Sequence, residues 1–267
     1  LLVLPVVSGV CSLIVAAAFL APAYFAGMFA QFTEAAKAGG NPEQMMTPGM
    51  YAWFFGFYIV QYFVIIFFNT ALVGAALLRL QGHNPTLGDA LAISMARIGT
   101  IMGYAVISAT VGVILRMIGE RFGFIGRIIE GLIGVAWTIS TFLVVPIIAA
   151  KGVGPITAVK ESAMLLRKTW GENVIGNGGI GLAFSLIILP IVLVGFGSAA
   201  YLVNTSAIPE LGYVVGAFTI VVVFALGIYS TALSGVYSAA VYRYAEGGST
   251  MRGFDRSLLD DAFRHKK

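Results

Sequence analysis

The chain has 267 residues, of which 59% are apolar and only 10% are charged, and its net charge is +4 at pH 7. A soluble domain is typically about 45–50% apolar and about 25% charged. These proportions exclude a soluble globular domain and a disordered chain, and the single cysteine excludes a disulfide scaffold. They predict a polytopic membrane protein with helical spans, because the bilayer interior offers no partners to the backbone groups of open strands.

Six apolar runs are long enough to cross a bilayer, which takes about 20 residues per helix. The predicted fold class is all-α: a six-helix transmembrane bundle with cytoplasmic amphipathic interfacial helices and a parallel internal repeat. Residues 1–244 form the membrane domain, and residues 245–267 form a cytoplasmic amphipathic tail. The predicted spans are 1–30, 51–80, 98–118, 124–150, 175–203 and 213–244.

Basic residues are distributed unequally between the two sides of these spans. Twelve of the 16 lysines and arginines fall in the loops after the second and fourth spans or in the tail. Because cytoplasmic loops carry the excess of basic residues, both termini are predicted to be cytoplasmic. The positive charge is thus explained by membrane orientation. No nucleic-acid partner is expected, since the sequence has no aromatic and basic RNA-binding motif.

Three cytoplasmic segments have the periodicity of amphipathic helices. Apolar residues recur at steps of three or four within 86–97, 156–170 and 251–265, and charged residues occupy the other faces. These segments are too short and too charged to span, so we expect them to lie at the membrane interface or to cover the cytoplasmic ends of the bundle. The predicted apolar faces of the first two contain Leu87, Leu91, Met95, Val159, Ala163, Leu166 and Trp170.

The first two of these segments belong to a predicted internal repeat. Pro85 and Pro155 each precede an arginine by 12 positions and lie 70 positions apart, while Thr70 and Thr141 lie 71 apart. The motif TALxG that begins at Thr70 recurs at 231–235. The unit is an even-numbered span, a turn, an amphipathic helix and the next span. Since all copies face the same side, the repeat is parallel.

Five motifs are spread along the chain: LLVLP at 1–5, FNTAL at 68–72, VPII at 145–148, AVKES at 158–162 and YRYA at 242–245. Through them the sequence resembles a family of uncharacterised prokaryotic six-span membrane proteins, a domain of unknown function. That family is distantly similar to YciC-type proteins and to the membrane domain of some glycerophosphodiester phosphodiesterases. The resemblance implies a multi-pass protein of the prokaryotic cytoplasmic (inner) membrane, with a basic amphipathic helix ahead of residue 1. It implies no catalytic residue.

Two amides, Gln61 and Asn69, lie within the second predicted span. They are eight positions apart, which places them roughly on one helical face. One interpretation is a solute or ion site, and the commoner one is hydrogen bonding between helices. No aspartate, glutamate, lysine or arginine falls at the centre of a predicted span, which argues against proton-coupled transport.

A cluster of five charged residues surrounds the turn between the third and fourth predicted spans. It is a candidate contact for an anionic headgroup or a partner protein. The simpler interpretation is a hairpin turn neutralised by pairs three or four residues apart. The cluster contains Arg116, Glu120, Arg121, Arg127 and Glu130.

No enzyme activity is predicted, and no catalytic, cofactor-binding or metal-ligating residue is assigned. The two histidines, His83 and His265, both fall on the cytoplasmic side, so no set of nucleophile, base and orienting group can be assembled from the spacing. The predicted function is a non-enzymatic integral membrane scaffold or accessory subunit. Its partners would be membrane lipids and other membrane proteins or a second copy of itself.

A transporter or channel for an apolar or lipidic small molecule is the alternative function. It is motivated by the internal repeat and by three prolines within spans, Pro22, Pro146 and Pro190, which are expected to kink their helices. This alternative predicts a cavity between the repeats, lined by residues such as Gln61 and Asn69.

Overall fold

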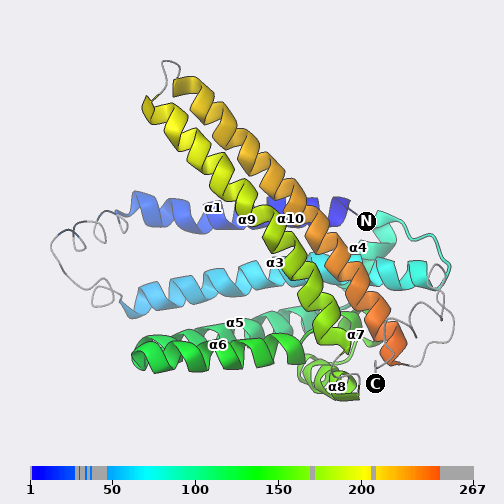
Figure 1. The fold of residues 1–267 in the computed structure, drawn as a ribbon. Helices are drawn as coiled ribbons and strands as arrows, with labels where there is room; N and C mark the ends of the chain where they lie inside the picture. Colours follow the sequence, from blue (N-terminus) through cyan, green and yellow to red (C-terminus); the bar gives the residue numbers. More distant parts are fainter. Residues whose placement is uncertain are drawn as a thin grey trace, which may run out of the picture.

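The computed structural model describes residues 2–27, 30, 34, 37, 47–168, 172–205 and 209–246. Every regular element within these residues is a helix, which confirms the predicted all-α fold (Figure 1). The helices are α1 (Val3–Phe25), α3 (Pro48–Leu80), α4 (Leu87–Ala96), α5 (Ile98–Arg121), α6 (Gly123–Ser140), α7 (Val144–Lys151), α8 (Pro155–Lys168), α9 (Glu172–Thr205) and α10 (Pro209–Ala245).

Six helical stretches in the described part of the chain are long and apolar enough to cross a membrane, and each overlaps one predicted span. The chain is therefore a multi-pass membrane protein. The amphipathic segments at 86–97 and 156–170 correspond to α4 and α8, while the predicted tail helix at 251–265 lies outside the described residues. The six stretches are Val3–Phe25, Pro48–Leu80, Ile98–Arg121, Gly123–Lys151, Ala183–Thr205 and Pro209–Ala245.

The main hydrophobic core lies where the predicted cytoplasmic ends of the helices meet. It joins the second half of α3, the start of α5, α7, α8 and the end of α10. Leu77, Ile101, Ile147 and Tyr242 are among its buried side chains. In Figure 1 the α9–α10 hairpin is inclined steeply to α1, α3 and α6, and α10 packs across α3 near this core. The bundle is thus held together mainly at one end.

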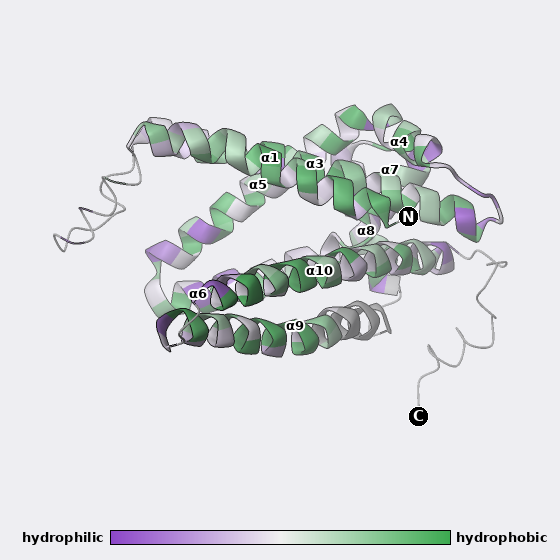
Figure 2. Cartoon of the chain, turned by 90° about the horizontal axis from the view of Figure 1, so that it is seen from above, coloured by the Kyte–Doolittle hydropathy of each residue, from purple (hydrophilic) through white to green (hydrophobic). Residues whose placement is uncertain are grey.

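The spans are apolar along most of their length, as the colouring of Figure 2 shows, and away from this core many of their large apolar side chains are exposed. The most apolar 18-residue window of α3 is 56% buried, but the corresponding windows of α1, the described part of α9, and α10 are only 11%, 6% and 11% buried. Contiguous apolar surface of this extent is expected to face lipid or another membrane protein.

The fourth span is broken next to Pro146, one of the three prolines expected to kink a span. Residues 141–143 form a turn between α6 and α7. In an uninterrupted helix, Pro146 would lack a hydrogen-bonding N–H, and its ring would clash with the carbonyl of Phe142. Near the start of α7, where backbone N–H groups have no helical partner anyway, the proline is tolerated. By contrast, α1 and α9 continue through Pro22 and Pro190.

Candidate functional site

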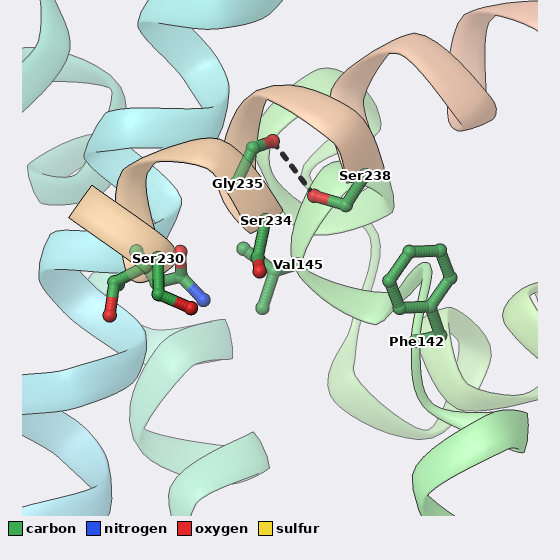
Figure 3. A pocket seen from close by; sticks show the side chains of 8 residues that line it. Phe142, Val145, Ser230, Ser234, Gly235 and Ser238 are labelled. Atoms are coloured by element: carbon green, nitrogen blue, oxygen red, sulfur yellow. Dashed lines mark hydrogen bonds between the residues drawn. The ribbon is translucent and has the colours of Figure 1, made fainter. Parts of the chain in front are cut away.

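A pocket of about 320 Å³ lies where α10 crosses α3 and the turn between α6 and α7. Its lining is polar for a site within a membrane domain, with four hydroxyls and one carboxamide, and no lining residue is charged. Figure 3 shows the view into it. We call it the serine pocket, and its lining residues are Asn69, Phe142, Val145, Ser230, Thr231, Ser234, Gly235 and Ser238.

Helix α10 supplies one wall of the serine pocket. Ser230, Ser234 and Ser238 recur every four residues, so they lie along one side of the helix. The Ser238 hydroxyl donates to the Gly235 carbonyl at 2.9 Å, as drawn in Figure 3, and the Thr231 hydroxyl donates to the Gly227 carbonyl at 2.9 Å. Such bonds to the preceding turn satisfy the hydroxyl protons within the helix. The oxygen lone pairs of these two hydroxyls can still accept a hydrogen bond from a ligand.

Helix α3 contributes Asn69, whose side-chain oxygen Oδ1 is buried and has no hydrogen-bond partner among the described residues. The close approach of α10 depends on Gly235, because a Cβ atom there would lie 2.6 Å from Leu72 Cδ2 and 3.6 Å from Asn69 Oδ1. A buried acceptor without a donor destabilises the protein by about 1–3 kcal/mol. This oxygen has almost no accessible surface, so Asn69 lines the pocket without offering its carbonyl oxygen to a molecule inside it.

The opposite wall exists because the fourth span is broken. Phe142 lies in the turn and Val145 in the first turn of α7. The turn is fixed by α8, since the Ser162 hydroxyl accepts a hydrogen bond from the backbone N–H of Leu143 at 3.1 Å. An uninterrupted helix would rotate these two side chains to other positions. The pocket thus combines α3, the α6–α7 break and α10.

The two amides predicted as a polar site are not brought together. Asn69 lines the serine pocket, whereas Gln61 does not. The Oε1 atom of Gln61 is likewise buried without a partner among the described residues. Eight residues of helix separate the two by about 12 Å along the axis, so one pocket of this size does not reach both.

The charged cluster lies at the α5–α6 hairpin. Arg116 Nε and Glu120 Oε1 pair at 2.7 Å, and both side chains are largely exposed. Glu130 packs against Gly119 of α5, where a Cβ atom would collide with its carboxylate. Arg121 and Arg127 form no ion pair within the described part of the chain. The cluster therefore consists of one local ion pair and three further charges that are not joined to it.

Helix α4 exposes its predicted apolar face. Leu87, Leu91 and Met95 are exposed, while Ala90 and Ser94 are buried against the bundle. The Ser94 hydroxyl donates to the carbonyl of Phe67 on α3 at 2.8 Å. Ala90, Ser94 and the half-buried Ile93, which packs over Gly74, thus attach α4 to α3, and Leu87, Leu91 and Met95 are left for another surface.

Helix α8 buries only part of its predicted apolar face. Leu166 is buried and Val159 is half-buried, but Ala163 is exposed. Two smaller residues, Ala158 and Ser162, are completely buried beside Leu166. Trp170 lies outside the described residues. The buried face is therefore rotated from the predicted one toward small residues that permit close packing.

Sequence reasoning missed the α10 wall of the pocket. The spacing Ser230, Ser234, Ser238 was the available signal, because hydroxyls at four-residue steps share a helix side. The positions of Phe142 and Val145 depend on a tertiary contact to α8, which no local pattern reports. In the described residues no group of three histidine, cysteine, aspartate or glutamate side chains is arranged to hold a metal ion.

Comparisons with curated proteins and with solved structures found no match for the chain. A comparison with protein families did find one, to a model described as a family of unknown function, DUF6159, over residues 49–254. Because that match covers more than half of the chain, the protein belongs to the DUF6159 family.

Proposed function

We propose that the protein is a non-enzymatic scaffold or accessory subunit of the prokaryotic cytoplasmic (inner) membrane, with both termini in the cytoplasm. The supporting observation is the low burial of three of its six spans: the best windows of α1, the described part of α9, and α10 are no more than 11% buried. An accessory subunit needs such faces, because helices associate in a bilayer through side-chain packing rather than through the hydrophobic effect. Partner membrane proteins, a second copy and lipids are the proposed occupants.

Helix α4 supports the proposed placement at the cytoplasmic interface. Its exposed residues Leu87, Leu91 and Met95 continue into Ile98 and Met102 of α5, which are also exposed. An apolar stripe that continues from a spanning helix into a helix too short to span suits the boundary between acyl chains and headgroups.

Similar hydrogen bonds support the proposed parallel repeat. Thr70 and Thr141, which the repeat aligns, each donate to the carbonyl four residues earlier, at 2.7 and 2.8 Å. Ser94 of α4 and Ser162 of α8 are both completely buried, and each bonds to the backbone of the preceding span. The distant similarity to YciC-type proteins stays a prediction.

Photo-crosslinking in native membranes tests the scaffold proposal. A photoreactive amino acid is placed at Leu193 or Val194, which are exposed on α9, and as a matched control at Ala199, which is buried against α10. We expect Leu193 and Val194 to yield adducts with another protein chain and Ala199 to yield none. Lipid adducts alone at Leu193, Val194 and the exposed α1 residues Leu13 and Ile14 would reject the scaffold role.

A second candidate function, transport of an apolar or lipidic small molecule, is favoured by one observation. The serine pocket provides a cavity that Asn69 lines, whereas Gln61, the other residue named for that cavity, does not line it. Flux of a lipid through proteoliposomes would test it, with empty liposomes as the reference. A flux no faster than in empty liposomes would reject transport without affecting the scaffold proposal.

A further inference from the structure

We propose that helix α8 binds the headgroups of anionic phospholipids through its outward side, which carries Ile156, Lys160, Met164 and Arg167. We call these four residues the α8 basic face. The inference deepens the proposed function, because it names the class of lipid that occupies one surface of the protein. It rests on the proposed placement of this end of the bundle at a membrane surface, but it does not require the scaffold role.

The α8 basic face combines positive charge with exposed apolar side chains. Ile156 and Met164 are 62% and 58% exposed, and Lys160 and Arg167 are exposed as well. The four residues follow one another at steps of three or four, so they share one side of the helix. This is not the apolar face that the sequence predicts for the segment, since Leu166 of that face is buried. A helix side with basic and apolar residues together suits the surface of a negatively charged membrane.

Two contacts on the other side of α8 fix which face points outward. The Ser162 hydroxyl accepts a hydrogen bond from the backbone N–H of Leu143 at 3.1 Å, and Ser162 is completely buried. Lys151 Nζ of α7 pairs with Glu161 Oε2 of α8 at 3.0 Å. Rotation of α8 about its own axis would break both contacts, so the α8 basic face is held in position before any ligand binds.

The positive charges of the α8 basic face are not neutralised by the protein. Glu161 is the only acidic residue of α8, and it is paired with Lys151, which also pairs with Glu246 at 3.0 Å. Lys160 and Arg167 form no ion pair within the described part of the chain. Each lysine or arginine near an anionic membrane surface favours binding by about fivefold. Two free basic residues on one helix side therefore select for negatively charged headgroups.

The position of α8 favours a lipid over a soluble acidic partner. In Figure 1 α8 lies at the same end of the molecule as α4, whose exposed Leu87, Leu91 and Met95 lead into a spanning helix. Helix α4 contains no lysine or arginine, so it has no preference for anionic lipid. On α8 the apolar Ile156 and Met164 can enter the boundary of the acyl chains, while long basic side chains keep their charged ends at the phosphates.

Photolabelling of the whole chain in phosphatidylcholine nanodiscs tests this inference. The two probes are phosphatidylglycerol and phosphatidylcholine with identical acyl chains, each with a photoreactive group close to the glycerol. At 0.1 M salt we expect phosphatidylglycerol to label residues 155–168 at least fivefold more than phosphatidylcholine does. At 1 M salt the ratio should fall below twofold, because the Debye length shrinks from about 10 Å to about 3 Å. A ratio that does not respond to salt would contradict binding through charge.

Three double variants locate the site. Lys160→Gln with Arg167→Gln removes both charges and should reduce the labelling ratio at residues 155–168 to below twofold. Arg121→Gln with Arg127→Gln is the matched control, because it removes two exposed arginines without ion pairs at the α5–α6 hairpin. It lowers the net charge equally and should leave the ratio within twofold of the unmodified protein. Lys160→Arg with Arg167→Lys keeps both charges and should also leave the ratio within twofold.

Several results would overturn the inference. Equal labelling by the two probes would show that α8 does not select anionic lipid, and equal losses in the α8 and hairpin variants would show an effect of net charge alone. Protein adducts in place of lipid adducts from a photoreactive amino acid at the exposed Ala163 would assign this surface to an acidic protein partner. Lipid selectivity without protein adducts at Leu193 and Val194 would keep the inference and reject the scaffold role. Protein adducts there without selectivity at α8 would do the reverse.

Discussion

The backbone N–H of Leu143 donates a hydrogen bond to the Ser162 hydroxyl at 3.1 Å, and both residues are completely buried. This bond joins the break in the fourth span to α8, two segments that lie 19 residues apart in the sequence. The first backbone N–H groups of a helix have no intrahelical partner, and α7 begins directly after Leu143. The side chain of Ser162 therefore stabilises a turn that Pro146 makes necessary.

Replacing Ser162 with alanine should destabilise the protein by about 1–3 kcal/mol, because the Leu143 N–H would be left buried without an acceptor. Thermal unfolding of the purified protein in detergent micelles measures the change. Thr157→Ala is the matched control, since Thr157 lies on the same helix but is exposed, and should change stability by less than about 0.5 kcal/mol. Equal effects of the two substitutions would show that the bond to Leu143 does not matter.

The turn between α7 and α8 depends on a glycine. Gly152 has φ +61°, and a Cβ atom there would collide with the Arg97 guanidinium group. The guanidinium group is the far end of a flexible side chain and can move aside, so Gly152→Ala should destabilise the protein mainly through left-handed backbone strain, by about 1–2 kcal/mol. The measurement is again thermal unfolding, with Gly154→Ala as the control because a Cβ at Gly154 meets open space. Adding Arg97→Ala to Gly152→Ala should therefore change the stability little, and a large recovery would show that the guanidinium group cannot move aside.

The stability of helix α4 should depend on pH, because a carboxylate in its first turn accepts hydrogen bonds. The carboxylate of Asp89 accepts hydrogen bonds from the backbone N–H and the hydroxyl of Thr86, each at 2.8 Å, and these bonds lower the pKa of Asp89 below its ordinary value of 3.8. A carboxyl whose pKa is lower in the folded state stabilises that state above its unfolded pKa, and the stabilisation disappears as the pH falls through the folded pKa. The helix start is thus strongest above about pH 4.

Hydrogen exchange of the peptide that contains α4 tests this pH dependence. Asp89→Asn keeps the size of the side chain but removes its charge, so the variant should exchange faster than the unmodified protein near pH 6. The difference between the two should shrink as the pH falls below 3.8. A difference that stays constant with pH would mean that the ionised carboxylate does not stabilise this capping box.

The sequence predicts the spans well because hydropathy is a property of each segment by itself. The six apolar runs correspond to the six candidate spans, and Pro48, Pro155 and Pro209 begin α3, α8 and α10, as expected of a residue whose missing N–H is harmless in a first helical turn. Which residues are buried is harder to predict, because burial depends on which helix faces pack against each other. Two examples are α8, where the buried Ala158 and Ser162 are small, and α4, where Leu87, Leu91 and Met95 of the predicted apolar face are exposed.

The serine pocket, too, could be predicted from the sequence only in part, because its walls depend on which helices pack together. Asn69 is conspicuous in the sequence because an amide within an apolar run needs a hydrogen-bond partner. Ser230 and Ser234 are not conspicuous, since a membrane helix tolerates isolated serines whose hydroxyls bond to the preceding turn. Their relevance depends on the crossing of α10 over α3, which in turn depends on the absence of a side chain at Gly235.

That crossing predicts that two glycine-to-alanine substitutions on α10 change the stability of the protein in opposite directions. At Gly235 a Cβ atom would lie 2.6 Å from Cδ2 of Leu72, whose side chain is only 1% exposed and has no space to move into. Gly235→Ala should therefore destabilise the protein by about 1–3 kcal/mol through overpacking. At Gly227 on the same helix a Cβ atom meets open space. Gly227→Ala should stabilise the protein by up to about 1 kcal/mol, because alanine has the higher helix propensity. Thermal unfolding of both variants measures the pair, and a stabilising effect at both positions would show that α10 does not pack on α3 through Gly235.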